Sequence, residues 1–153
     1  MESGTFFKEK IMIVEKMRME DIPQVTALQQ QLMPEPVCYD RAEENYRAIL
    51  ADENYFVAVA REGDTVLGTL TGICCRGLGL NFLVLEDLIV REDLRGGGIG
   101  TALMQAVDDF GRERDCDYAI LVSSGFRKRA HHFYEKMGYV EDVRGFRKSL
   151  AEV

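Results

Sequence analysis

Several features are scarce in this 153-residue chain: it has no tryptophan and only three prolines. Its apolar runs are far shorter than the ~20 residues of a membrane-spanning helix, so we expect no membrane partner. Residues 1–10 mix acidic and basic side chains without an apolar core, so we also expect no signal peptide. These absences lead us to expect a soluble protein of the cytoplasm.

Cysteine and histidine are also scarce. The four cysteines include no Cys-x-x-Cys pair, and they stand at positions 38, 74, 75 and 116. Without an export signal, reduced thiols are the simplest expectation. The two histidines, His131 and His132, are neighbours, and neighbouring helical side chains point ~100° apart. We therefore expect no metal site.

Basic residues are outnumbered. The chain has 26 acidic and 19 basic side chains, which gives a formal net charge of −7. Nucleic-acid binding usually needs a basic face, so we expect no nucleic-acid partner. The charge is compatible with a cationic substrate, although an acidic, well-solvated surface is the more ordinary explanation.

The composition fits one domain that spans residues 1–153. A chain of this length with 46% hydrophobic residues can bury one good core. The apolar patterns predict strands over 11–14, 55–60, 65–75, 82–90 and 118–122. They predict helices over 22–32, 40–50, 99–110 and 127–137. This order indicates a mixed α/β fold.

Turn and cap residues mark several boundaries. Asp21 is placed to cap the first helix, with Pro23 in its first turn. Gly138 fits a helix C-cap. Residues 139–143 and 146–150 predict a final hairpin.

The most informative motif is the run Arg95-Gly-Gly-Gly-Ile-Gly-Thr101, between a predicted strand and a predicted helix. The first amides of a helix lack partners within the helix, and the helix dipole favours negative charge there. Glycine lets the backbone approach an anion closely. A plain tight turn with a charged rim is the alternative, but four glycines exceed what a turn needs. We therefore predict a phosphate site, with positive charge from Arg95.

Two nucleotide-binding motifs fit this run poorly. A P-loop requires a lysine before its Ser or Thr, but Thr101 directly follows Gly100. A dinucleotide loop requires a third glycine at the position that Thr101 occupies. A nucleotide-binding protein unrelated to acyl transfer remains an alternative. The missing lysine and the missing third glycine count against it.

Arg95-Gly-Gly-Gly-Ile-Gly100 resembles the Arg/Gln-x-x-Gly-x-Gly/Ala signature of the GNAT superfamily, the acetyl-CoA-dependent N-acetyltransferases. Residues 124–139 resemble the family's motif Ser-Gly-x-x-Arg-x-x-Ala-His-x-Phe-Tyr-Glu-x-x-Gly-Phe/Tyr, and the strands 85–90 and 146–148 match as well. The element order agrees over nearly the whole chain. The resemblance implies the GNAT fold: a central mixed, mostly antiparallel sheet with splayed parallel strands, flanked by helices.

The resemblance also implies a cofactor site. In the family, the glycine run holds the pyrophosphate of coenzyme A, and the preceding strand offers backbone hydrogen bonds to the pantetheine arm. Two more contacts fall on Ser124 and Arg127, and many members have asparagine at the second of these positions. The implied cofactor-binding residues are Leu88, Ile89, Val90, Arg95, Gly96, Gly97, Gly98, Ile99, Gly100, Thr101, Ser124 and Arg127.

Acetyl transfer to an amine needs a base, because an alkyl amine has a pKa near ~10.4 and is protonated at neutral pH. Glu86 and Asp87 interrupt an apolar strand, where charges are seldom needed for packing. Strand alternation sends them to opposite faces. We therefore predict Glu86 as the base, directly or through water, and Asp87 as a substrate contact or structural partner. An ordinary salt bridge or helix cap explains these acids almost as well.

The departing thiolate needs a proton donor, and a tyrosine with a pKa of about 10 is protonated at neutral pH. The resemblance gives Tyr134 this role, with a core tyrosine as the alternative. His131 is a candidate substrate contact, and a packing or surface histidine is at least as good an explanation.

The resulting prediction is an enzyme that moves acetyl from acetyl-CoA directly to a primary amine of a small metabolite. Acetylation of a protein amine and a non-catalytic coenzyme A-binding module are the alternatives. The family usually builds specificity around residues 33–46, where acidic side chains would favour a cationic amine. A homodimer is plausible from the family and from the terminal hairpin. We expect Cys74 and Cys75 to pack within a strand. A covalent acetyl-cysteine route is the less favoured alternative, because no base is identified beside them.

Overall fold

The computed structural model describes residues 11–125 and 127–151. The chain divides into two compact units, residues 1–120 and 121–153. The described elements are β1 (Met12–Lys16), η1 (Met19–Asp21), α1 (Ile22–Gln30), α2 (Ala42–Leu50), β2 (Tyr55–Glu62), β3 (Thr65–Arg76), β4 (Asn81–Val90), η2 (Glu92–Leu94), α3 (Ile99–Glu113), β5 (Tyr118–Leu121) and α4 (Lys128–Lys136).

The strands form one five-stranded sheet in the order β1-β2-β3-β4-β5. The pairs β1–β2, β2–β3 and β3–β4 are antiparallel. The last strand, β5, follows α3 and lies parallel to β4. This mixed, mostly antiparallel sheet confirms the predicted fold class.

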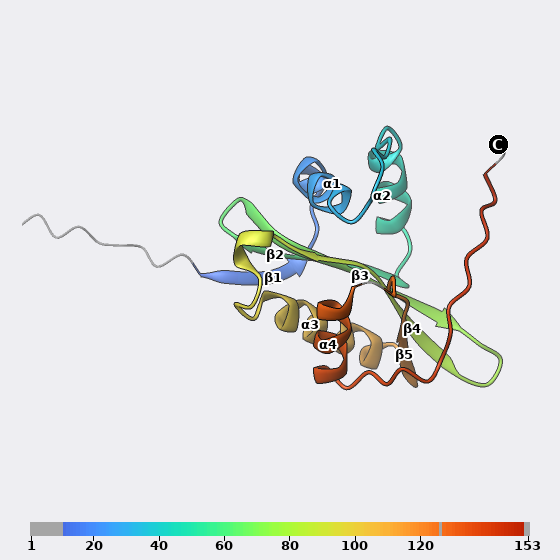
Figure 1. The fold of residues 1–153 in the computed structure, drawn as a ribbon. Helices are drawn as coiled ribbons and strands as arrows, with labels where there is room; N and C mark the ends of the chain where they lie inside the picture. Colours follow the sequence, from blue (N-terminus) through green and yellow to red (C-terminus); the bar gives the residue numbers. More distant parts are fainter. Residues whose placement is uncertain (1–10, 126, 152–153) are drawn as a thin grey trace, which may run out of the picture. The chain divides into compact units, whose positions relative to one another are not determined.

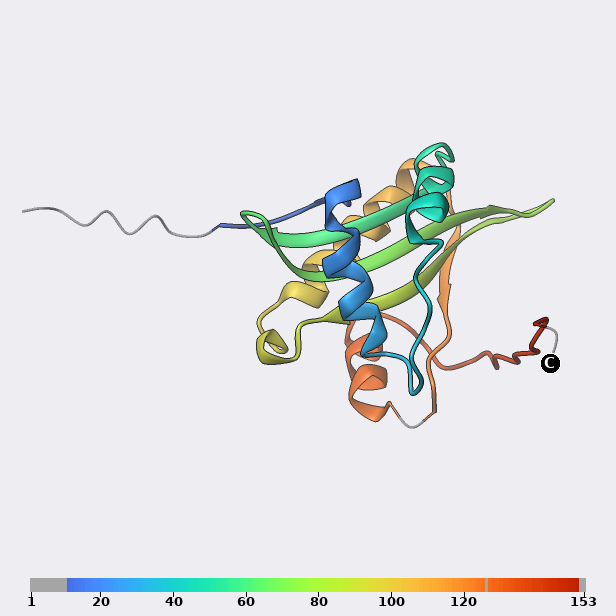
Figure 2. The ribbon, with the colours of Figure 1, turned by 90° about the horizontal axis from the view of Figure 1, so that it is seen from above.

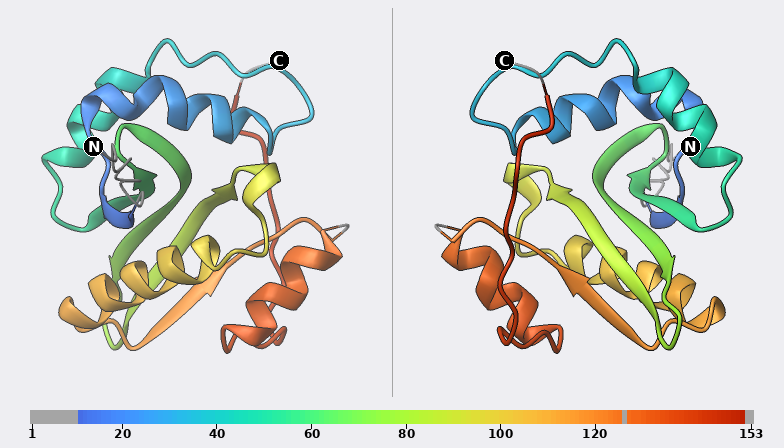
Figure 3. Two further views of the ribbon diagram at one scale, coloured as in Figure 1. Left: turned by 90° about the vertical axis from the view of Figure 1, so that its left-hand side faces the viewer. Right: turned by 90° about the vertical axis from the view of Figure 1, so that its right-hand side faces the viewer.

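In the first unit, α1 and α2 cover one face of the sheet, and α3 covers the other (Figure 1). Figure 2 looks down on α1 and α2, and Figure 3 shows the strands between α1 and α3 from two sides. Buried Val25, Leu28 and Tyr46 pack with Ile89 on the first face. On α3, Leu103, Met104 and Val107 are fully buried.

Two glycines of β3 allow α3 to lie close to the sheet. A Cβ atom at Gly72 would come within 2.6 Å of Val107 Cγ1, and one at Gly68 within 3.2 Å of Leu103 Cδ1. Packing this tight leaves little room for α3 to shift. The start of α3, which follows the glycine run, is therefore well fixed against the sheet.

Strand β4 carries a bulge. Its register against β3 shifts between Thr69 and Thr71, so that Leu70 faces two residues, Asp87 and Leu88. The backbone of Asp87 has φ 58, a left-handed conformation that is uncommon for a residue other than glycine. The bulge therefore interrupts the strand in the middle of its acidic pair.

The bulge changes which side chains face which helices. Before it, Leu83 lies against α3, where a Cβ at Gly111 would come within 2.9 Å of Leu83 Cδ2. Unbroken alternation would send Ile89 to that same face. Ile89 instead belongs to the cluster under α1 and α2. Glu86 lies three positions after Leu83, so strand alternation directs its side chain to the face opposite α3, which α1 and α2 cover.

A buried ion pair ties the start of α1 to the sheet. Arg61 and Asp21 are each 2% exposed, and Arg61 Nη1 donates to Asp21 Oδ1 at 2.9 Å. Arg61 Nε also lies 2.7 Å from Glu15 Oε1 on β1. Asp21 is the N-cap residue of α1, as predicted, but its side chain makes no capping hydrogen bond, because its carboxylate accepts from Arg61 and from the Arg18 amide instead. Pro23 does lie in the first turn of α1.

In the second unit, α4 ends as predicted. Gly138 has φ 95, and the Tyr139 amide donates to the Tyr134 carbonyl at 3.0 Å. The Gly138 amide donates to the Glu135 carbonyl at 3.0 Å. This pair of hydrogen bonds is a Schellman motif, which the left-handed conformation of Gly138 makes possible.

The predicted final hairpin is wrong. Residues 139–150 contain no strand, and their large apolar side chains are exposed: Phe146 is 94% exposed and Leu150 is 88% exposed. A two-stranded hairpin is marginal unless it packs an apolar face, and Val140, Val143, Phe146 and Leu150 are all exposed. Within the described ranges, no helix is long and apolar enough to cross a membrane.

Replacing Asp21 with alanine should destabilise the protein strongly. The change leaves the Arg61 guanidinium buried beside the single acid Glu15, and breaking a buried pair typically costs about 3–5 kcal/mol. Urea unfolding measures the loss in free energy of unfolding. Asp109→Ala is the matched control, because its pair with Arg112 is more than 70% exposed and should contribute under about 0.5 kcal/mol. Equal effects of the two changes would contradict the structural role of Asp21.

The same pair predicts a pH effect. Burial tends to raise the pKa of Asp21, but hydrogen bonds from Arg61 and the Arg18 amide, with the Arg61 charge, outweigh it and lower the pKa below its ordinary value. Its stabilisation is therefore complete above the ordinary carboxyl pKa of ~3.9 and is lost as the pH falls toward the lower folded value. Unfolding curves should show that wild type has a larger free energy of unfolding than Asp21→Asn at neutral pH, and that this difference is lost only below about pH 4. An advantage lost nearer neutral pH would contradict this assignment.

Candidate active site

The acidic pair on the β4 bulge forms the first part of the site. Glu86 and Asp87 are both exposed. Tyr39, in the connection between α1 and α2, lies near them: burial and then the charge of Asp87 raise the pKa of the Tyr39 hydroxyl. The charge of Asp87 thus reaches a phenol from a distant part of the sequence.

Both carboxyl groups hold their protons more tightly than ordinary acids. Burial raises the pKa of Asp87. Burial and then the charge of Asp87 raise the pKa of Glu86. Both side chains nevertheless keep access to solvent. A carboxylate with a raised pKa is a better proton acceptor, which suits Glu86 to act as a base.

The bulge alters the reasoning that separated these two acids. Alternation predicted that Glu86 and Asp87 face opposite sides of the sheet, but the alternation is interrupted at Asp87. The charge of Asp87 reaches both Glu86 and Tyr39. The bulge therefore removes the reason for assigning the two acids to opposite faces of the sheet.

The glycine run forms the second part of the site, directly after β4. Gly96 has φ 88 and Gly98 has φ 86, and Gly98 is the N-cap of α3. A Cβ at either position would meet nothing within 4 Å, so the backbone faces open space. The first amides of α3, from Ile99 to Thr101, have no partner within the helix. This arrangement fits a phosphate group.

Several residues that the resemblance assigns to the cofactor lie beside the glycine run. Arg95 is exposed, and its Nε donates to the Val90 carbonyl at 3.4 Å. Ile89 and Val90 pair with β3, whereas Leu88 lies in the bulge outside that pairing. By the resemblance, this strand offers backbone hydrogen bonds to the pantetheine arm. Its backbone is irregular at the bulge.

The second unit carries the remaining predicted residues, in and around α4. His131 Nε2 lies 3.0 Å from the Ser124 carbonyl oxygen, and the Arg127 amide donates to the same oxygen at 3.0 Å. His131 is half-buried, whereas Ser124 is exposed. His131 thus has a structural contact at the start of α4, which agrees with the packing alternative for this residue.

Tyr134 is half-buried on α4. Its ring packs against Tyr139, with centroids 6.1 Å apart, and against Phe133, at 5.8 Å. Burial raises the pKa of Tyr134, and the charge of Arg127 lowers it by a smaller amount. Tyr134 is therefore protonated at neutral pH, as a proton donor must be.

Sequence reasoning missed Tyr39 and the bulge. Tyr39 lies in a connection without a recognisable motif, and its approach to Asp87 depends on how α1 and α2 fold over the sheet. The bulge has no glycine to signal it, because Asp87 itself adopts the left-handed conformation. Among the described residues, no group of three metal-ligating side chains comes together.

The chain matches the family model for the acetyltransferase (GNAT) family over residues 22–139. It belongs to the GNAT family. The match includes both the acidic bulge and the glycine run, together with Tyr134. Membership places the chain in the class of GNAT acetyltransferases, as its motifs predicted.

Relatives of known description are N-acetyltransferases. An aminoalkylphosphonate N-acetyltransferase of Salmonella typhimurium is 25% identical over 139 residues, which cover 86% of each chain. A streptothricin acetyltransferase of Streptomyces lavendulae is 35% identical over 91 residues, 58% of this chain. The match spans only 46% of that second relative's length.

Solved structures share the fold. A glucosamine-6-phosphate N-acetyltransferase from Arabidopsis thaliana superposes with a TM-score of 0.79 at 18% identity, over 92% of this chain and 99% of that one. An acetyltransferase from Clostridium acetobutylicum, solved with acetyl-CoA, superposes with a TM-score of 0.74 at 17% identity, over 92% and 97%. At these identities the likeness concerns the fold alone.

Replacing Gly98 with valine should weaken coenzyme A binding at least about tenfold, because a side chain at the start of α3 would occupy the space that an anion needs. Titration calorimetry with coenzyme A measures the affinity. Gly63→Val is the matched control: Gly63 also has a positive φ, 55, and open space around a Cβ, but it lies in the β2–β3 turn. Both variants carry similar backbone strain. Equal affinities would contradict the phosphate assignment.

Proposed function

We propose that this chain transfers the acetyl group of acetyl-CoA to a primary amine of a small molecule. The observation that carries the proposal is the path of β4. The strand presents two carboxyl groups of raised pKa on a bulge and then leads within a few residues to an anion-binding helix start. Family membership supports the same chemistry.

The hydrogen-bond donors of this region fit the pyrophosphate of acetyl-CoA. Amides at the start of α3 and the guanidinium of Arg95 would hold the pyrophosphate, and Gly96 and Gly98 leave the space for it. Backbone groups of Leu88, Ile89 and Val90, together with Ser124 and Arg127 in the second unit, are the further proposed contacts. When bound, acetyl-CoA supplies an acetyl group already activated as a thioester.

Glu86 is the proposed base. An amine reaches this site as an ammonium ion and must lose a proton before it can attack a carbonyl carbon. The raised pKa of Glu86 makes its carboxylate a better base for taking a proton from the ammonium ion. Its exposure to solvent allows a water molecule to carry that proton. The neighbouring charge of Asp87 helps by making protonation of Glu86 more favourable.

Tyr134 is the proposed acid. Its hydroxyl keeps its proton at neutral pH and can give it to the sulfur that leaves. Arg127, close enough to lower the pKa of Tyr134, would help to stabilise the phenolate that results. The acetyl group would pass directly from acetyl-CoA to the amine in a ternary complex.

The acceptor proposed is a cationic amine. Glu86 and Asp87 face it with negative charge, and Tyr39 adds a hydroxyl from the connection between α1 and α2. Asp87 and His131 are the proposed substrate contacts. Streptothricin and aminoalkylphosphonates are the acceptors that the names of two relatives give, and both are small amines. A homodimer in the cytoplasm also remains a proposal.

Glu86→Gln should lower kcat/KM by about 10²-fold or more, because the amide cannot accept the proton of the amine. Thiol release from acetyl-CoA, measured with a panel of amines, gives the rate. In wild type, kcat/KM should fall as the pH drops through the raised pKa of Glu86, above 4.5. Glu92→Gln, on η2 after the strand, is the control and should keep full activity. An unchanged rate in Glu86→Gln would remove Glu86 from the role of base.

Tyr134→Phe should lower turnover by about 10²-fold while coenzyme A affinity stays within about threefold, because the change removes only the hydroxyl proton. Steady-state kinetics and calorimetry measure the two effects. Tyr118→Phe is the matched control, since Tyr118 is 48% exposed at the start of β5. A loss of affinity equal to the loss of turnover would point to a binding role instead.

A further inference from the structure

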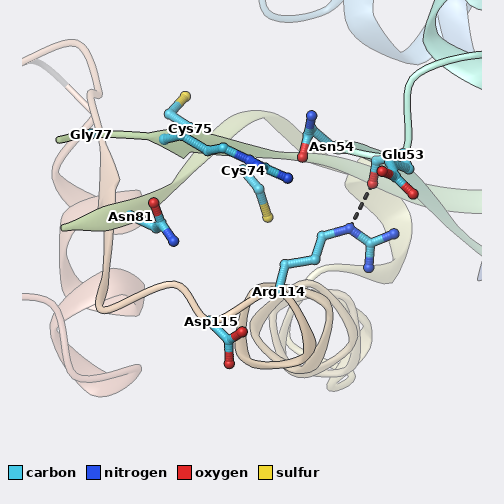
Figure 4. Close-up of a pocket in the computed structure, with 9 residues that line it drawn as sticks. Glu53, Asn54, Cys74, Cys75, Gly77, Asn81, Arg114 and Asp115 are labelled. Atoms are coloured by element: carbon cyan, nitrogen blue, oxygen red, sulfur yellow. Dashed lines mark hydrogen bonds between the residues drawn. The ribbon is translucent and has the colours of Figure 1, made fainter. Parts of the chain in front are cut away.

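A recess lies in the first unit, at the opposite end of β4 from the glycine run. Its volume is about 560 Å³, within the range of about 300–1,000 Å³ that is typical of small-molecule sites. The connection before β2, the end of β3, the start of β4 and the end of α3 line it together (Figure 4). These lining residues lie outside both the acidic bulge and the glycine run, so a ligand here would occupy a separate site.

Arg114 is held in place at one side of this recess. It is the C-cap residue of α3, and its amide donates to the Gly111 carbonyl at 3.2 Å. Its Nε atom donates to the Glu53 carbonyl at 2.6 Å, and its guanidinium lies over the Phe110 ring, 4.3 Å from the centroid. These contacts position the side chain before a ligand arrives, which lowers the entropic cost of binding.

Most of the Arg114 guanidinium remains available. Arginine has five N–H donors, and the bond to Glu53 uses the one on Nε. Within the described part of the chain, the two Nη atoms have no hydrogen-bond partner and Arg114 forms no ion pair. A shortage of acids does not explain this, because the chain has 26 acidic and 19 basic side chains. The planar fork of an arginine matches the oxygens of a carboxylate or a phosphate.

Three further side chains add donors to the same recess. Arg76 forms no ion pair with the acids that the structure describes, and the side-chain amides of Asn54 and Asn81 form no hydrogen bond among the described residues. Cys74 and Arg76 are alternate residues of β3, so their side chains leave the same face of the strand. Figure 4 shows Cys74 pointing toward Arg114, which places the α3 end of the recess on that face.

The two acids of the lining differ from these donors in their exposure. Glu53 and Asp115 are exposed, whereas Asn54, Asn81 and Arg114 are half-buried. Solvent and salt screen an exposed charge more strongly than a partly buried one. Attraction by the half-buried guanidinium is therefore stronger than repulsion by the two exposed carboxylates, and the recess favours an anion.

We propose that this recess binds a small organic molecule that carries a carboxylate or a phosphate group. The fork of Arg114 would hold two of its oxygens, and Arg76 with the side-chain amides of Asn54 and Asn81 would hold the others. Carboxylates and phosphates present the same oxygen acceptors to these donors, so the test uses one probe of each kind. The proposal requires nothing from the proposed acetyl transfer.

Nuclear magnetic resonance of the full chain, labelled with nitrogen-15, tests the proposal by titration with succinate and, separately, with inorganic phosphate. The backbone amide signals of Asn54, Gly77, Asn81 and Asp115 should shift with at least one probe and should saturate with a Kd of about 1 mM or lower. Succinamide has nearly the same shape as succinate but no charge. It is the matched control ligand and should cause no such shifts.

Two substitutions locate the binding groups. Arg114→Met and Arg76→Met should each weaken the affinity at least about tenfold, because each removes a charged donor. Arg112→Met is the matched control: Arg112 belongs to α3, pairs with Asp109 and does not line the recess, so the affinity should stay within about twofold. Arg76 is exposed at the end of its strand, so its variant tests the site even if Arg114→Met fails to fold.

The outcomes separate the two ligand classes and the two anion sites. Shifts with succinate alone would assign a carboxylate ligand, and shifts with phosphate alone would assign a phosphate ligand. No shift at the recess with either probe, equal shifts with succinamide, or shifts confined to residues 96–101 would overturn the proposal. Equal weakening by Arg112→Met and by the two recess variants would overturn it as well.

Discussion

The bulge of β4 is the constraint on which the candidate site depends. By placing Asp87 and Leu88 opposite the single residue Leu70, it lets Ile89 pack under α1 and α2 while two carboxyl groups stay at the surface. A regular strand would turn the second acid toward the core beneath α3, where an unpaired charge is unfavourable. The left-handed conformation of Asp87 has an energetic cost, which the packing on both faces of the sheet must offset.

Packing around the bulge fixes the other parts of the first unit. Gly68 and Gly72 let α3 lie tightly on β3, and this contact positions the helix start that follows the glycine run. On the opposite face, the buried pair of Asp21 and Arg61 anchors the beginning of α1 to the sheet. Anion-binding amides and acidic side chains thus come from elements that are held on both faces of one sheet, which is how a small domain can keep a site preorganised.

Much of this arrangement follows from sequence patterns, and the exceptions have physical causes. Apolar spacing predicted α3, and the glycine run predicted its N-terminus, because both signals are local. Asp21 stands at the predicted N-cap position, but its side chain does not cap the helix. No local pattern could show this, because the partner of its carboxylate, Arg61, lies forty positions later. The terminal hairpin failed for a similar reason: a suitable strand pattern around Phe146 does not form a strand without a surface to pack on. The approach of Tyr39 to Asp87 likewise depends on tertiary contacts alone.

The central claim is that the carboxyl groups of the bulge and the glycine run serve one reaction, the acetylation of an amine. Steady-state measurement of thiol release from acetyl-CoA, with and without a panel of cationic amines, tests it most directly. The account predicts release that depends on the amine, with an acetylated product detected by mass spectrometry. Folded protein that binds acetyl-CoA but releases thiol at the same rate with and without every amine would contradict it.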